Sequence, residues 1–314
     1  MKDRKDSRQS RRERVAQMVA KLAESSHPDF DSLWDYEHPA DTEKKFRELL
    51  PIALASKNTS YRAQLLTQIA RTQGLQRKFT EAHQTLDEVA KLLPDSDNRT
   101  RGRYLLERGR ALNSSGKPSE SKPLFHQAWD MARESGEDFL AVDAAHMIAI
   151  VELPENQLDW NLKALDLAEK ATDPRARKWK GSLYNNVGWT LFESKEHNKA
   201  LDMFQKALRW RQEQGQPREV RIAKWCVAKT LRALSRLHEA LEVQKTLINE
   251  YDKEGERSGY VYEELGECLL ALGQAGEAGK FFAMAHEELS KDPWLVENEP
   301  ARLGRLKELG KPEL

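Results

Sequence analysis

Residues 181–214 read GSLYNNVGWTLFESKEHNKALDMFQKALRWRQEQ, and this stretch decides the fold. Counted from Gly181 as place 1, small residues stand at places 8, 20 and 27, and larger ones at places 4, 7, 11 and 24. Small side chains at facing places let two antiparallel helices approach closely, and the larger ones fill the space around that contact. The stretch therefore predicts two packed helices joined by a turn. The small residues are Gly188, Ala200 and Ala207, and the larger ones are Tyr184, Val187, Leu191 and Phe204.

This spacing resembles the tetratricopeptide repeat, a helix–turn–helix unit of about 34 residues. The resemblance implies an all-α fold, a right-handed α-α superhelix in which about six repeats stack between capping helices at both ends. Place 8 holds alanine or glycine in every repeat that the same register predicts. The six predicted repeats begin near Ala63, Gly102, Asp138, Gly181, Arg221 and Gly259.

A second resemblance lies near the N-terminus, where residues 30–50 read FDSLWDYEHPADTEKKFRELL. This segment is similar to the N-terminal signature of a group of uncharacterised bacterial tetratricopeptide proteins. The resemblance implies a bacterial protein and brings no activity with it.

The flanks of the array are predicted to close its two ends. Apolar residues recur at helical spacing between Ser10 and Glu24, and a last helix is expected over residues 294–309. Pro51 lies inside a further helical pattern, so that helix either kinks there or breaks just before it. The predicted regions are a disordered N-terminus at 1–9, N-terminal helices and a loop at 10–60, six repeats at 61–293, and a C-terminal capping helix and tail at 294–314.

Composition limits the classes of function. The chain has 51 Lys and Arg against 51 Asp and Glu, so its net charge is zero and gives no argument for nucleic acid, which we do not expect as a partner. Two cysteines are too few for a disulfide framework. No apolar run is long enough to cross a membrane, and the N-terminus lacks the apolar region of a secretory signal. We therefore expect a cytoplasmic protein.

The resemblance implies that the first helix of each repeat lines a concave groove. On the groove places the sequence predicts a basic first third, a centre of aromatic and amide groups, and an acidic last repeat. Such rings suit an extended peptide or a helix, because they supply buried area while Asn at place 6 can bond a ligand backbone. In the other interpretation the rings pack on neighbouring helices. The predicted peptide-binding residues are Arg71, Arg110, His146, Asn185, Asn186, Trp189, Trp225, Lys229 and Arg232.

No enzyme motif is complete in the sequence. The stretch GQAGEAGKF at 273–281 lacks the spacing of a phosphate-binding loop, and the eight histidines form no zinc-binding motif, so we expect no cofactor and no metal. Glu263, Glu264 and Glu267 are the one candidate for catalytic acids, which a solvated acidic face explains more simply. Cys226 and Cys268 are most simply explained as small helical residues; in the alternative, Cys226 faces the groove and its thiol is open to oxidation.

These observations predict a non-enzymatic scaffold that binds a peptide or protein segment in its concave groove. The alternative is a peptide-responsive sensor whose superhelix changes shape when the ligand binds. The carboxylate clamp of related chaperone-binding proteins is not predicted, because Arg71, Arg110 and Asn186 do not occupy its places in consecutive repeats. The sequence favours no particular oligomeric state.

Overall fold

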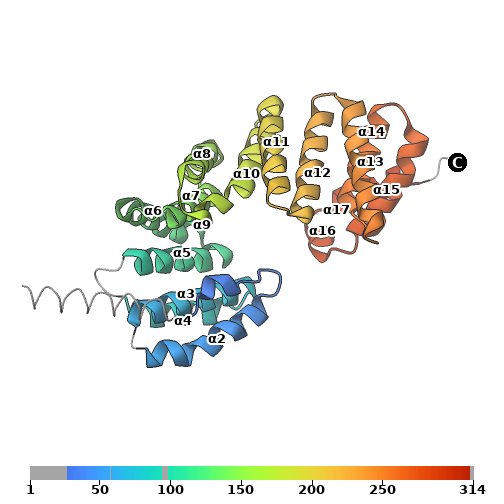
Figure 1. The fold of residues 1–314 in the computed structure, drawn as a ribbon. Coiled ribbons are helices and arrows are strands. Elements are labelled where there is room, and N and C mark those ends of the chain that lie inside the picture. Colours follow the sequence, from blue (N-terminus) through green and yellow to red (C-terminus); the bar gives the residue numbers. More distant parts are fainter. Residues whose placement is uncertain (1–26, 57, 94–97, 312–314) are drawn as a thin grey trace, which may run out of the picture. The chain divides into compact units, whose positions relative to one another are not determined.

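The computed structural model describes residues 27–56, 58–93 and 98–311. All regular structure in these ranges is helical (Figure 1). The contacts within the chain define two compact units, one ending at Leu153 and the other beginning at Pro154. The helix predicted between Ser10 and Glu24 and the disorder predicted at 1–9 lie outside the described residues.

The first unit begins with a short 3-10 helix and continues with helices that pack in chain order. α3 packs on α4 and α5 packs on α6, while the first helices α3, α5 and α7 also contact each other in sequence. Its elements are η1 (Phe30–Leu33), α2 (Pro39–Ala55), α3 (Thr59–Leu75), α4 (Phe79–Ala90), α5 (Asn98–Ser114), α6 (Pro118–Ser135) and α7 (Asp138–Val151).

The second unit contains three consecutive helix pairs, α10 with α11, α12 with α13 and α14 with α15. α8 packs on α10, and α17 packs on α15. Its elements are α8 (Pro154–Lys170), α9 (Pro174–Lys178), α10 (Lys180–Glu193), α11 (His197–Glu213), α12 (Pro217–Ala233), α13 (Leu237–Lys253), α14 (Gly259–Ala271), α15 (Ala275–Leu289), α16 (Pro293–Asn298) and α17 (Pro300–Leu309).

The predicted all-α repeat fold is confirmed. Two helices stand where each of the six predicted repeats places them, and the boundary between the two units falls between the helices of the third. The turn that follows the first helix has the same backbone conformation in five repeats, with a positive φ at place 15. That left-handed conformation suits glycine and costs other residues on the order of 1 kcal/mol. The residues at place 15 are Arg77, Gly116, Lys195, Ser235 and Gly273, with φ between 60° and 83°.

In four of the six repeats the core of the helix pair includes the residues at place 8 and place 24. Where place 24 is phenylalanine, place 8 is glycine, because a Cβ there would lie 2.4–2.8 Å from the ring. In the first repeat Ala70 packs in one cluster with Leu86, which is smaller than phenylalanine. In these repeats the two places therefore share one volume. The glycine and phenylalanine pairs are Gly109 with Phe125, Gly188 with Phe204, and Gly266 with Phe282.

Prolines explain where the helices depart from the prediction. The single C-terminal helix predicted over 294–309 is wrong, because the chain leaves the helical conformation at Glu299, directly before Pro300. α17 then begins at Pro300, whose missing N–H is not needed in the first turn. In contrast, α2 continues through Pro51. The loop expected near 171–176 contains the start of α9.

Candidate functional site

The first helices of the first unit carry a ladder of ion pairs. Arg71 on α3 lies 3.2 Å from Glu107 on α5, and Arg110 on α5 lies 2.6 Å from the same carboxylate. Arg110 also pairs with Asp143 on α7. None of these four side chains is more than 20% exposed. The predicted peptide-binding residues Arg71 and Arg110 therefore bind the chain's own carboxylates.

Burial and charge act on the ladder in opposite directions. Burial alone would raise the pKa of the Asp143 carboxyl, but the guanidinium groups of Arg110 and Arg71 outweigh it and hold that pKa below its usual value. His146 lies one turn further along α7 and is half-buried. Burial lowers the pKa of His146, so its imidazole is neutral near pH 7. The ladder thus contains two positive and two negative charges, which neutralise each other.

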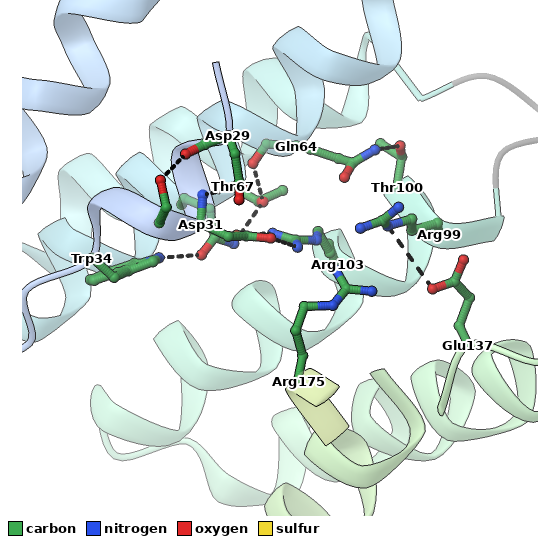
Figure 2. A network of polar contacts seen from close by, with 12 residues as sticks. Asp29, Asp31, Trp34, Gln64, Thr67, Arg99, Thr100, Arg103, Glu137 and Arg175 are labelled. Atoms are coloured by element: carbon green, nitrogen blue, oxygen red, sulfur yellow. Dashed lines mark hydrogen bonds and ion pairs between the residues drawn. The ribbon is translucent and has the colours of Figure 1, made fainter. Parts of the chain in front are cut away.

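The N-terminal strap, residues 27–38, contacts α3 and α5 (Figure 2). Asp31 on η1 accepts a hydrogen bond of 2.9 Å from Nη1 of Arg103. The indole Nε1 of Trp34 donates to Oε1 of Gln68 at 3.0 Å. Arg103 stands at place 2 and Gln68 at place 6, which are groove places of the predicted repeats. The strap therefore binds to the face on which a ligand was expected.

Aromatic rings of the strap also lie beside Arg71 on α3. Trp34 and Tyr36 stack with their centroids 4.6 Å apart, and the guanidinium carbon of Arg71 lies 5.8 and 5.6 Å from those two centroids. Phe30 of the strap is buried in the same hydrophobic core as Phe46. The strap is thus anchored by its apolar side chains and occupies the surface beside Arg71.

The first helices of the second unit carry a row of aromatic rings. The ring centroids of Trp189 on α10 and Trp225 on α12 lie 5.9 Å apart, and those of Trp225 and Tyr260 on α14 lie 6.0 Å apart. Nε1 of Trp225 donates to the backbone oxygen of Tyr260 at 3.0 Å. Both tryptophans are half-buried, and Tyr260 is exposed. Trp189 also packs edge-on against Phe204. Part of the ring surface is therefore packed on a neighbouring helix, and part remains accessible to a ligand.

The remaining predicted residues surround this aromatic row. Oδ1 of Asn185 accepts a weak hydrogen bond from the thiol of Cys226 at 3.6 Å. Asn186 is half-buried on the same helix. Lys229 lies 3.3 Å from Glu264, which also pairs with Arg232. The structure therefore brings the six predicted residues of the second unit to one set of helices.

One pairing rule recurs in both units. A cation at place 9 of one repeat pairs with a carboxylate at place 6 of the next, at separations of 36, 33 and 35 residues. The sequence contained this signal, because opposite charges stand at those places at three of the five junctions between repeats; the other two junctions pair His146 with Asn186 and Trp189 with Cys226. The three pairs are Arg71 with Glu107, Arg110 with Asp143, and Lys229 with Glu264.

The acids of the last repeat stand where the sequence places them, but the solvated acidic face predicted for them is wrong, because Glu264 is 2% exposed and all three acids pair with cations. Glu263 and Glu267 on α14 pair with Arg302 and Arg305 on α17, and Glu264 pairs with the two cations on α12. No carboxylate of this cluster is left without a cation. The sequence analysis missed the two arginines because they belong to the C-terminal cap.

The tetratricopeptide repeat profile matches residues 181–213, which form most of α10 and all of α11. The chain, in which this segment is a tetratricopeptide repeat, has an all-helical repeat fold. Its fold is similar to that of a signal transduction ATPase with numerous domains from Pyrococcus horikoshii that has a tetratricopeptide repeat sensor (TM-score 0.68, 16% identity, 88% of this chain covered). The chain spans 43% of the length of that protein.

Two further solved structures have a similar fold. The apo form of RapI gives a TM-score of 0.69 at 12% identity, covering 92% of this chain and 85% of RapI. NprR in complex with its cognate peptide NprX gives 0.52 at 14% identity, covering 89% of this chain and 82% of NprR. No curated protein matches the sequence. At these identities the likeness is one of fold.

The chain has two thiols that its helices enclose. Cys226 and Cys268 are both buried within the helices, in agreement with small helical residues and against the alternative in which Cys226 opens to the groove. Burial raises the pKa of each thiol to about 12. Since a thiolate is the reactive form, neither thiol is reactive near neutral pH.

The two thiols are expected to react with a thiol reagent at pH 8 at least about 100-fold more slowly in the folded protein than in urea. Because the folded pKa is raised, the thiols stabilise the fold fully below their unfolded pKa of 9.0. That contribution is lost as pH rises toward about 12. Ellman's reagent and melting curves at pH 7–11 measure both effects. Rapid reaction of either thiol in buffer would contradict the burial argument.

Within 27–56, 58–93 and 98–311, no group of three or more His, Cys, Asp and Glu side chains is arranged to hold a metal ion. No helix in the same part of the chain combines the length and the apolar character that a membrane span requires.

Proposed function

We propose that the chain is a non-enzymatic interaction scaffold that binds a peptide or protein segment along the first helices of its second unit. The observation that carries the proposal is the aromatic row of Trp189, Trp225 and Tyr260 on three successive repeats. Tryptophan and tyrosine dominate binding energies at protein interfaces, because they bury a large area with few rotatable bonds. Asn185 and Asn186 add amide groups beside the row.

The first unit supports this choice by contrast. Its corresponding face carries the strap, whereas the aromatic row of the second unit has two half-buried tryptophans and the exposed Tyr260. NprR, which has a similar fold, was solved with its cognate peptide, and this supports a peptide as the ligand. We also propose a cytoplasmic location, in agreement with two free cysteines.

The test is a random 12-residue peptide library displayed on phage and selected against the whole chain. Binders are then measured against a Trp189→Ala/Trp225→Ala variant and against Trp129→Ala, which removes a half-buried tryptophan from the second helix α6. We expect the double variant to bind about 1000-fold more weakly, since central tryptophans contribute about 2 kcal/mol or more each and about 1.4 kcal/mol corresponds to a tenfold change. The control is expected to bind normally.

Circular dichroism and melting curves must show that the double variant remains helical. Binders that keep their full affinity for it would overturn the proposal. Small-angle scattering with bound peptide tests the sensor alternative, which predicts a change in the radius of gyration, whereas a passive scaffold predicts none.

A further inference from the structure

We infer that the segment bound by the second unit is acidic, with apolar side chains between its carboxylates. This inference rests on the proposed function and adds the chemistry of the partner. It comes from seven charged residues on α12, α14 and α17 that flank the aromatic row. The inner acids are Glu263, Glu264 and Glu267, and the outer cations are Lys229, Arg232, Arg302 and Arg305.

Helix geometry places the two sets in layers. The outer cations stand three residues apart on each flanking helix, so each pair shares one helix face. α14 lies between the flanking helices in these contacts, because its Glu264 pairs with α12 while its Glu263 and Glu267 pair with α17. Three carboxylates are thus held between four cations.

Exposure differs consistently between the two sets. Glu264 is 2% exposed, whereas its partners Lys229 and Arg232 are 26% and 28% exposed. Glu263 is 14% exposed against 28% for Arg302. In the same way, Glu267 is 17% exposed against 50% for Arg305. Every pair therefore buries its acid and presents its cation to solvent.

The cations also stand beside the rings of the aromatic row. The ammonium of Lys229 lies 5.2 Å from the ring centroid of Trp225, and the guanidinium carbon of Arg302 lies 5.3 Å from that of Tyr260. Arg302 also contacts Glu299, which is 34% exposed and is the one acid of this surface as open as its partner. A ligand that covers the rings therefore meets cations at the same time.

This arrangement selects a ligand by charge complementarity. A carboxylate near the outer cations gains charge-assisted hydrogen bonds, whereas a cationic side chain there meets like charge. The inner acids cannot compensate, because their oxygens face the cations that cover them. The chain's zero net charge gives no long-range attraction for polyanions such as nucleic acid, so the local pattern favours a peptide.

The test uses two synthetic pools of 12-residue peptides that differ only in charge. Both pools alternate random apolar residues with charged ones, which are Asp and Glu in the first pool and Lys and Arg in the second. Binding to the whole chain is measured by fluorescence anisotropy at 50 and 500 mM NaCl. We expect the acidic pool to bind at least about 10-fold more tightly at low salt and to lose most of this preference at high salt.

The variants separate this inference from the proposed function. Arg305→Gln is expected to weaken the acidic pool about three-fold or more, whereas Lys307→Gln, an exposed cation on the same helix, leaves it unchanged. Two results would contradict the acidic ligand but not the scaffold. One is an equal loss of affinity in both variants, and the other is tighter binding of the basic pool while binding still requires Trp189 and Trp225. Acidic binding that survives loss of both tryptophans, or stronger binding of a 12-nucleotide single strand, would overturn both proposals.

Discussion

A Glu107→Met variant is expected to lose about 3–5 kcal/mol of its free energy of unfolding. Glu107 is 5% exposed and is the shared partner of Arg71 and Arg110, so its removal leaves two enclosed guanidinium groups with one fewer carboxylate. Asp143 can balance only part of that charge. Breaking a buried ion pair costs much more than the pair contributes, because the remaining charge is poorly hydrated. Urea titration followed by circular dichroism measures the loss.

A matched control substitutes a glutamate that is exposed to solvent. Glu239 on α13 pairs with Arg236, which directly precedes that helix, and is 57% exposed, so Glu239→Met is expected to shift the urea midpoint far less than Glu107→Met. Glu107→Gln keeps the shape of the side chain and should fall between the two. If Glu107→Met is as stable as the control, the ladder is not energetically significant.

Phe204→Ala is expected to destabilise the second unit by about 3–5 kcal/mol. The ring is fully buried against Gly188, so truncation leaves a cavity between α10 and α11. Backbone atoms line much of that space, and helices cannot collapse into it without losing their other contacts. Thermal melting and urea titration both report the effect.

A compensating variant tests whether places 8 and 24 share one volume. Gly188→Ala alone places a Cβ 2.6 Å from the Phe204 ring and should destabilise the fold by about 1–3 kcal/mol. Gly188→Ala combined with Phe204→Leu recreates the Ala70 and Leu86 combination of the first repeat and should lose less than the sum of its parts. Strict additivity of the two changes would contradict the shared volume.

The repeat register could be predicted from the sequence because its causes are local. Small residues such as Gly188 and the rings that face them, such as Phe204, stand in one helix pair at a fixed spacing. No other part of the chain alters that contact. The same holds for the turn at Lys195, whose conformation follows from the helices on either side. These features need only one repeat to be recognised.

The state of the candidate site could not be predicted in the same way. Whether Arg71 is free or paired depends on Glu107 in the next repeat and on Trp34 in a segment outside the array. Likewise, the charge that Glu263 presents depends on Arg302, which lies beyond the last repeat. Assigning groove places one residue at a time identifies side chains on the first helices of the repeats. It treats each of these side chains as unpaired. The position of the aromatic row was predicted, and its neighbours on α17 were not.

The pairing of place 9 with place 6 has a consequence for how such an array can change by duplication or deletion. Loss of the second repeat from the first unit would set Arg71 opposite Asp143, which again joins a cation to an acid. Loss of the fifth repeat would instead set Trp189 opposite Glu264 and leave that enclosed carboxylate without its cations. Some repeats can therefore be lost without breaking an ion pair, whereas others cannot. The residues at place 9 of one repeat and place 6 of the next determine which.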